Sequence, residues 1–236
     1  MYADDLVVFC ASANGRQKLL NVCTQFGSDN DVLFNSLKSQ LMLFDTRKYG
    51  ANCEVFLGDK PLVYVDNYTY LGHIIVNKLS DESDMKSKIR QIYGRCNMLI
   101  RKFHFCTTEV KNRLFSTFCN NLYLSYLWVN CRKSVFKSVK VAFNNAYRIL
   151  HNLDRRCSAS GMFVNNGVQS YPEVNRKCIY GFMKRLNCSH NCIISTIVAS
   201  DIYFTSDLTF HWHHCVYLGS CRVNVPLVIC ADSQLQ

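Results

Sequence analysis

Several features are scarce or missing in this 236-residue sequence, and each absence excludes a class of protein. Only three prolines and ten glycines are present, so no long flexible linker or low-complexity segment marks a domain boundary. No run reaches the roughly eighteen uncharged apolar residues of a membrane-spanning helix. No secretory signal precedes the chain, and no internal repeat is visible. We therefore expect a soluble, intracellular protein that is neither secreted nor inserted in a membrane, with the choice between nucleus and cytoplasm left open.

What the sequence does contain is enough apolar material for a folded core. Hydrophobic residues make up 49% of the chain, which suits one domain or two small ones. Fourteen cysteines are scattered among apolar positions, and without a secretory signal they do not indicate a disulfide framework. We expect these thiols to be reduced.

The positive charge of the chain is concentrated in one segment. The formal net charge is +10, and residues 86–156 hold fifteen Lys and Arg against two acidic residues. Residues 1–85 are acidic by comparison, with seven Lys and Arg against eleven Asp and Glu. Such a segment is expected to follow a phosphate backbone and release counterions on binding. The alternative is an ordinary solvated basic face.

The first eighty residues predict a mixture of strand and helix. An apolar, β-rich run at residues 6–10 follows an acidic pair and predicts a buried strand. Residues 32–44 predict extended segments, and residues 53–57 and 62–65 predict two strands joined by a turn at Gly58-Asp59. A short amphipathic helix ending at Gly27 is predicted from apolar residues at helical spacing, which are Leu19, Leu20, Cys23 and Phe26.

After residue 80 the pattern becomes helical. Three amphipathic helices are predicted, the first after acidic residues at 81, 82 and 84 and the second capped by Thr107 or Thr108. Residues 179–186 and 193–199 also predict helices, whereas residues 216–230 alternate like a strand. The apolar faces of the three helices are expected to be Ile89, Ile92, Cys96, Leu99 and Phe103, then Val110, Leu114, Phe118 and Leu122, then Val135, Val139, Phe143, Ala146 and Leu150.

The acidic pair near the start could hold a divalent cation. Asp4 and Asp5 lie between a Tyr-Ala pair and the predicted strand, which would place two carboxylates at the edge of a sheet. Hard oxygen ligands suit Mg²⁺, and nucleotidyl transfer uses two such ions roughly 3.5 to 4 Å apart. Taken alone, a four-residue acidic turn is also compatible with an ordinary surface turn.

Three motifs in order give the turn its context. Tyr-Ala-Asp-Asp at residues 2–5, followed by Leu-Val-Val-Phe, resembles the catalytic turn of reverse transcriptases. Asn-Ser-Leu-Lys-Ser at residues 35–39 resembles their next motif, and Tyr-Leu-Gly at residues 70–72 resembles the segment that grips the primer end. Residues 89–128 resemble the helical thumb of LINE-type, jockey-like enzymes of non-LTR retrotransposons, and residues 142–165 resemble the region after it.

The resemblance implies an α+β fold in three parts. Residues 1–79 would form an incomplete antiparallel palm, residues 80–156 a basic helical thumb, and residues 157–236 a mostly helical tail. The activity it implies is RNA-directed DNA synthesis with Mg²⁺, deoxynucleotides, an RNA template and a DNA primer.

The resemblance also implies roles for single residues at the catalytic turn and the next motif. Asp4 would be a direct metal ligand and Asp5 a nearby carboxylate of the same turn. Tyr2 would lie beside the incoming nucleotide or the primer terminus. Lys38 would protonate or neutralise the departing pyrophosphate, a task that suits a mobile ammonium near developing negative charge. The alternative for Lys38 is a surface lysine on an edge strand.

Nucleic-acid contacts are expected further along the chain. Leu71 and Gly72 would shape the primer grip, Gly72 by allowing close approach of the backbone. The thumb would hold the template and primer duplex mainly through phosphates. The expected contacts are Lys86, Lys88, Arg90, Arg95, Arg101, Lys102, Lys111 and Arg113.

The resemblance implies that further parts of the active site come from earlier sequence. In the family, another metal-binding aspartate and the fingers precede the turn, whereas this chain begins one residue before it. We therefore expect weak or absent Mg²⁺ binding and negligible polymerase activity for the chain alone. The alternatives are a non-catalytic nucleic-acid-binding module derived from the thumb and a degenerate element product without function.

Two further patterns have competing interpretations. A zinc site could use two Cys, one His and one Cys, but eighteen residues separate its halves, so buried thiols are the alternative. Four aromatic residues interleave with the basic positions and could stack on unpaired bases, although core packing is the alternative for each. The candidate zinc ligands are Cys188, Cys192, His211 and Cys215, and the aromatic residues are Tyr93, Phe103, Phe105 and Tyr126.

Overall fold

The computed structural model describes residues 5–44, 54–120 and 122–217, and the chain divides into two compact units, Met1–Asp84 and Met85–Gln236. Helices and strands are both present, which confirms the predicted mixed α and β content. Among the described residues, no helix combines the length and apolarity needed to cross a bilayer.

The first unit contains one helix and several very short strands among its described residues. The strands form three separate pairs, with β1 parallel to β4, β2 antiparallel to β3, and β5 antiparallel to β6. The elements are α1 (Ala13–Asp29), β1 (Gln40–Leu41), β2 (Phe56–Leu57), β3 (Lys60–Pro61), β4 (Val63–Tyr64), β5 (Asn67–Tyr70) and β6 (His73–Val76).

Helix α1 has a polar cap and a close backbone approach near its end. The Ser12 hydroxyl accepts a hydrogen bond from the Gly15 N–H at 3.1 Å, which satisfies a backbone donor of the first turn. The helix continues two residues beyond Gly27, where the sequence predicted its end. A Cβ at Gly27 would come within 2.5 Å of the Val32 carbonyl oxygen. Glycine is therefore needed at this position for close packing, and it does not stop the helix.

The strand predicted at residues 6–10 is wrong, because the structure has no strand there. The run is irregular, and Phe9 is 81% exposed. The physical reason is that β-propensity stabilises a strand only when another strand pairs with its backbone. Residues 32–44 are likewise mostly irregular, with β1 their one strand. The turn at Gly58-Asp59 is confirmed, with Gly58 at a φ of +60°, and the strand before it is confirmed at β2, whereas Cys53 lies outside the described residues. The strand predicted at residues 62–65 has the wrong partner, because β2 pairs with β3 and β4 pairs in parallel with β1.

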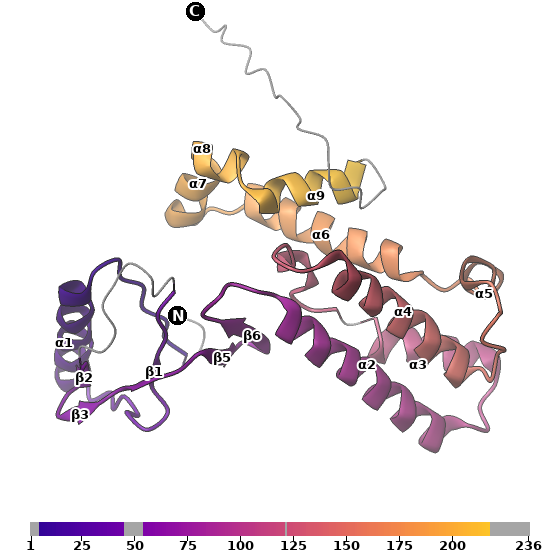
Figure 1. The fold of residues 1–236 in the computed structure, drawn as a ribbon, viewed down its shortest axis with the longest axis horizontal. Coiled ribbons are helices and arrows are strands. Elements are labelled where there is room, and N and C mark those ends of the chain that lie inside the picture. Colours follow the sequence, from indigo (N-terminus) through magenta and orange to yellow (C-terminus); the bar gives the residue numbers. More distant parts are fainter. Residues whose placement is uncertain (1–4, 45–53, 121, 218–236) are drawn as a thin grey trace, which may run out of the picture. The chain divides into compact units, whose positions relative to one another are not determined.

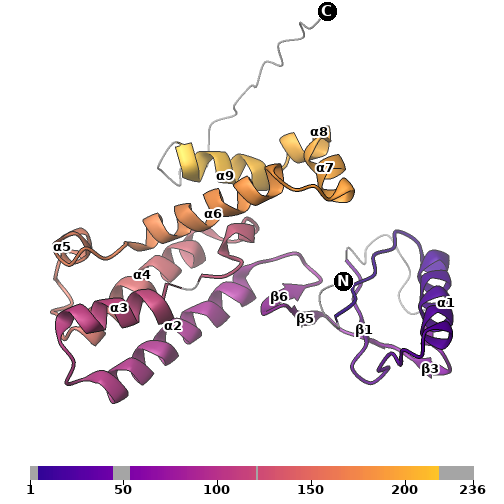
Figure 2. The same cartoon turned by 180° about the vertical axis from the view of Figure 1, so that it is seen from behind.

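The second unit is built from helices in its described part. Figures 1 and 2 show α2, α3 and α4 side by side, α6 along α4, and α9 along α6. The first residues of α2 belong to the first unit. The elements are α2 (Glu82–Phe103), α3 (Thr108–Phe118), the 3₁₀ turn η1 (Ser125–Leu127), α4 (Lys133–Leu150), α5 (Ala159–Asn165), α6 (Tyr171–Asn187), α7 (Cys192–Val198), α8 (Asp201–Phe204) and α9 (Asp207–Tyr217).

Helix α4 lies at the centre of the larger core. The ring of Phe115 packs edge-on against Phe143 and Tyr147, each at a centroid distance of 5.1 Å. The Cys96 thiol donates a hydrogen bond to the Ala146 carbonyl at 3.0 Å and so joins α2 to α4. The apolar faces predicted for these two helices are confirmed, since their residues are buried in this core or packed against it.

The apolar face predicted for α3 is wrong in part. Val110 and Phe118 are exposed, whereas Phe115 and Cys119 are fully buried. The reason is that Phe115 packs against aromatic rings of α4. This contact turns the side of α3 that carries Phe115 towards the core. The N-cap prediction is confirmed at Thr107, although its side chain makes no capping hydrogen bond.

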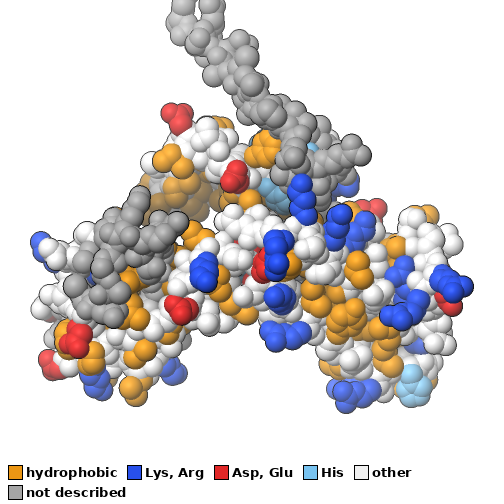
Figure 3. Space-filling view, in the orientation of Figure 1, with side chains coloured by type: hydrophobic (Ala, Val, Ile, Leu, Met, Phe, Trp, Pro, Cys, Tyr) orange, Lys and Arg blue, Asp and Glu red, His pale blue; other side chains and the backbone are white. Residues whose placement is uncertain are grey.

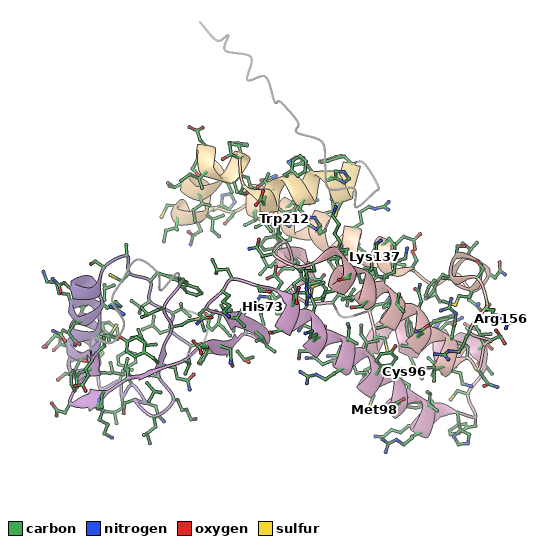
Figure 4. All side chains as sticks on the ribbon, viewed as in Figure 1. His73, Cys96, Met98, Lys137, Arg156 and Trp212 are labelled. Atoms are coloured by element: carbon green, nitrogen blue, oxygen red, sulfur yellow. The ribbon has the colours of Figure 1, made fainter. Side chains whose placement is uncertain are left out.

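A second, smaller core joins η1, α6 and α9. The Trp212 indole, labelled in Figure 4, donates a hydrogen bond to the Tyr126 carbonyl at 2.6 Å. The Tyr126 ring stacks on Phe182 with centroids 4.1 Å apart. The buried residues of this core lie between Tyr126 and Cys215, and those of the larger core lie between Met85 and Val174. Both cores therefore include residues on each side of the domain boundary expected at 156/157.

The helices predicted at residues 179–186 and 193–199 are confirmed by α6 and by α7, which ends at Val198. The strand predicted at residues 216–230 is wrong at its start, because Val216 and Tyr217 belong to α9. Residues 218–230 lie outside the described part of the chain.

Candidate metal-binding turn and nucleic-acid interface

The predicted catalytic turn is described only at its last residue. Tyr2 and Asp4 lie outside the described residues, and Asp5 is exposed in an isolated β-bridge. The predicted pairing of Asp4 with Asp5 around Mg²⁺ therefore stays a prediction. Within residues 5–44, 54–120 and 122–217, no group of three His, Cys, Asp or Glu residues is gathered so that it could hold a metal ion.

Lys38 lies in a turn organised by Asn35. The Asn35 side-chain oxygen accepts hydrogen bonds from the backbone N–H groups of Leu37 at 3.0 Å and Lys38 at 3.2 Å. The Asn35 carbonyl accepts a further bond from the Ser39 N–H at 3.0 Å. This local bonding is typical of an Asx turn and explains why the motif does not continue as a strand. The turn leaves the Lys38 side chain exposed.

Leu71 and Gly72 form the tip of the β5–β6 hairpin. Tyr70 pairs with His73, so the two residues between them make the whole loop. Their φ angles are 47° and 78°, and positive φ at both central residues is the mark of a type I′ turn. A Cβ at Gly72 would meet nothing within 4 Å, so glycine is favoured here by its backbone angle. Leu71 also adopts this left-handed backbone conformation, which costs a non-glycine residue about 1–2 kcal/mol of conformational free energy.

A buried carboxylate holds this hairpin against the start of α2. The Asp84 side chain is completely buried; its Oδ1 accepts the Ile74 N–H at 3.1 Å and its Oδ2 lies 2.9 Å from His73 Nδ1. Figure 4 shows His73 between the β5–β6 hairpin and the first turn of α2. The sequence indicated only that Asp84 suits a helix start. The contacts of Asp84 with Ile74 and His73 were not predicted, because no local sequence pattern indicates them.

The eight cations expected to contact nucleic acid differ in exposure. Arg95 is half-buried and donates from Nη1 to the Phe118 carbonyl at 3.1 Å, which ties α2 to the end of α3. Lys111 is also half-buried. Lys88 departs from the expectation, because it is only 7% exposed. The exposed members are Lys86, Arg90, Arg101, Lys102 and Arg113.

Three of the exposed cations share one side of α2. Lys86, Arg90 and Arg101 fall close together around the helix because an α-helix repeats every 3.6 residues. They extend over about 22 Å of helix axis, and the buried face of α2 lies on another side. Arg113 on α3 is paired with Glu109 at 3.5 Å, but both side chains are highly exposed, so the pair is worth little. Lys and Arg side chains border an apolar area over these helices in Figure 3.

A second cationic row on α4 was missing from the predicted contact residues. Lys133, Lys137 and Lys140 are all exposed, and their spacing of four and then three residues places them on one side of the helix. Figure 4 shows Lys137 near the first end of α4 and Arg156 beyond its other end. The spacing was visible in the sequence and could have identified this row.

The buried thiols belong to the core. Burial raises the pKa of Cys96 to about 11 and that of Cys119 to about 12. Both are therefore protonated at neutral pH, which suits neither metal ligation nor nucleophilic attack. Of the four candidate zinc ligands, His211 and Cys215 are close, with Nε2 and Sγ 3.5 Å apart. Cys188 and Cys192 are exposed and are not gathered with them into a metal-binding group.

Comparisons of the chain with protein-family models, with curated proteins and with solved structures gave no match. The function proposed below rests on the residues of the chain itself.

Proposed function

We propose that the chain is the palm and thumb portion of a LINE-type reverse transcriptase and that α2 and α3 bind a template and primer duplex through its phosphates. The observation that carries the proposal is the order of features along the chain. An acidic turn, an exposed lysine in an Asn-led turn, and a tight hairpin at Leu71-Gly72 are followed directly by cationic helices. This is the order in which the family places its catalytic turn, next motif, primer grip and thumb.

The residues of the turn suit Mg²⁺ by their chemistry, since carboxylate oxygens are the ligands that this ion prefers. Asp4 and Asp5 would hold the ion, which neutralises charge on the reacting phosphates. Lys38 would place a proton near the departing pyrophosphate. Two carboxylates of one turn leave a metal ion mostly hydrated, so these 236 residues alone are not expected to extend a primer.

Salt-dependent binding to a labelled duplex tests the thumb. Each phosphate contact contributes about 0.9 to the slope of log affinity against log salt. Replacing Lys86, Arg90 and Arg101 by Ala should therefore reduce this slope by about 2.7. The matched control removes the same charge from α6, at three of its exposed cations, which are Arg176, Lys177 and Lys184.

Two results would contradict the thumb assignment. One is an affinity for duplex that does not fall as salt rises. The other is an equal loss of slope in the α6 control, because binding would then follow net charge and would not be localised to α2.

Primer extension tests the catalytic part. The chain is assayed alone and together with a separately supplied fingers and palm fragment, in the presence of Mg²⁺ and deoxynucleotides. Extension is expected only in the complemented reaction, and Asp4→Ala should abolish it. Extension by the chain alone that Asp4→Ala removes would overturn the expectation that the site needs further residues.

A non-catalytic nucleic-acid-binding module is the second candidate. The observation that favours it is that the exposed cations of α2, α3 and α4 belong to a helical unit with its own buried cores. Duplex binding without extension in any complemented reaction would select this candidate. A product without function is distinguished from both by the absence of salt-dependent binding.

A further inference from the structure

One aromatic side chain among the basic positions of the second unit is largely exposed to solvent. Of the four aromatic residues that interleave with basic positions, Tyr93 and Phe103 pack against the larger core and Tyr126 is buried in the smaller one. Phe105 is 76% exposed. It lies in the short connection between α2 and α3. Burying a Phe side chain would stabilise the fold by about 1.5–3 kcal/mol, and Phe105 gains little of this. Packing in a core therefore does not explain a phenylalanine at this position.

The connection that carries Phe105 is an ordered turn. The Cys106 N–H donates to the Phe103 carbonyl at 3.2 Å, directly around Phe105. The His104 ring meets the Phe105 ring edge-on, with centroids 5.4 Å apart and planes at 87°. An edge contact leaves at least one face of the Phe105 ring open. The turn therefore presents a flat aromatic surface in a defined place.

Charge identifies the occupant of this surface. Arg101 and Lys102 lie in the last turn of α2, immediately before His104 and Phe105. Residues 85–118 contain eight Lys and Arg and a single acidic residue, Glu109. Unpaired nucleotides offer both a ring face and a negative phosphate, and an aromatic ring beside cations is how proteins bind them. The rings of a duplex are covered by their neighbours except at its ends.

We propose that Phe105, with Arg101 and Lys102, is a stacking site for an unpaired nucleotide of single-stranded nucleic acid. The site rests on the proposed function in that α2 and α3 bind a duplex, and it adds recognition of the single strand that continues beyond the duplex. The base stacks on the open face of Phe105. The two cations contact the phosphates on either side of that base.

Binding to two duplexes tests the site with the full chain. One duplex is blunt, and the other carries a short single-stranded extension with a fluorescent purine analogue, placed at the 3′ or the 5′ end. The extended duplex should bind about fivefold more tightly, the lower end of the range for one base stacked on one aromatic residue. Stacking should also quench the analogue.

The variants separate stacking from charge and folding. Phe105→Ala should abolish both the preference and the quenching and leave affinity for the blunt duplex unchanged, whereas Phe105→Trp should retain them. Phe204→Ala is the matched control, because Phe204 is also an exposed phenylalanine but lies on α8 beside Asp201. Thermal melting of each variant should be unchanged, since the replaced side chains are exposed.

Three outcomes would overturn the site: no preference for the extended duplex, a preference that survives Phe105→Ala, or a Phe105-dependent affinity for anionic vesicles without any such preference. Failure of the proposed function is a different result. In that case the blunt duplex does not bind, while Phe105-dependent binding and quenching persist on the single strand alone.

Discussion

The two units of the chain form their secondary structure by different means. In the first unit, the described strands are two to four residues long and pair in three separate ladders. In the second unit, helices such as α4, with 18 residues, surround two buried cores. The difference follows from where backbone hydrogen bonds find their partners, because a helix satisfies them within its own segment and a strand needs a second segment.

Burial follows the same division. Leu33 in the first unit is 98% exposed and Phe9 is nearly as open, whereas Phe143 and Tyr147 in the second unit are completely buried. An apolar residue stabilises a fold only when it leaves water. A similar apolar content therefore gives a buried core where the apolar residues recur at helical spacing, and a much smaller one where they do not.

Hydrogen exchange on the full chain gives the largest expected difference between the units. Backbone amides in the middle of α4 should exchange on the order of a thousandfold more slowly than those of α1, because opening α4 disrupts a core. Both segments are helical, so the contrast measures tertiary packing alone. Equal protection of the two helices would show that tertiary packing stabilises α1 as much as α4.

The next largest effect concerns the centre of the larger core. Phe143→Ala should lower the free energy of unfolding of the second unit by about 3–5 kcal/mol, because it leaves a cavity among Phe115, Phe163 and Tyr171. Phe9→Ala is the control, with an expected change within about 0.5 kcal/mol. Urea titration followed by circular dichroism measures both. A comparable loss in the control would show that residues 6–10 are packed.

An intermediate effect is expected where α2 begins. Asp84→Asn should lower the free energy of unfolding by about 2 kcal/mol. The substitution removes the charge of a buried carboxylate that accepts a hydrogen bond from the Ile74 N–H and contacts the His73 ring. Exchange of the Ile74 amide should rise, while amides at the centre of α4 stay protected. A double-mutant cycle with His73→Ala measures the coupling of the two side chains, and a coupling near zero would contradict a stabilising contact between them.

The smallest effect is a dependence on pH in the second unit. Burial lowers the pKa of His151 below its ordinary value of 6.5, and the charge of Lys111 adds to this effect. A lowered folded-state pKa means that the neutral ring stabilises the fold above about pH 6.5 and that this contribution is lost as pH falls. The melting temperature should drop by a few degrees towards pH 5, and less so in His151→Gln. An identical drop in the variant would assign the acid sensitivity elsewhere.

The sequence predicted the helical part of the fold far better than the rest. The apolar faces of α2 and α4 could be predicted because each lies within one segment of about twenty residues. The face of α3 was misassigned, since Phe115 is turned inward by rings on another helix. The strand at residues 6–10 was predicted from composition, and composition does not reveal whether a partner strand is present.

The residues of the candidate site also divide into those that the sequence could predict and those that it could not. The exposed cations of α2 were identifiable from charge and spacing, and so was the row on α4 that the contact prediction left out. The burial of Lys88 and the long-range partners of Asp84 were not identifiable, because both depend on segments distant in sequence or on tertiary packing. The exposure of Phe105 was not identifiable either. The other three aromatic residues that interleave with the basic positions are packed in the cores, and the sequence pattern does not distinguish Phe105 from them.

The hydrogen bond from Trp212 to Tyr126 joins positions 86 residues apart. The buried residues of the larger core end at Val174, with Cys178 packed against them, so this core can form while the rest of the chain is still being synthesised. The smaller core must wait until α9 has left the ribosome. During that interval Ile179 and Met183 stay uncovered, which makes it the period when a nascent chain is most open to capture by a chaperone.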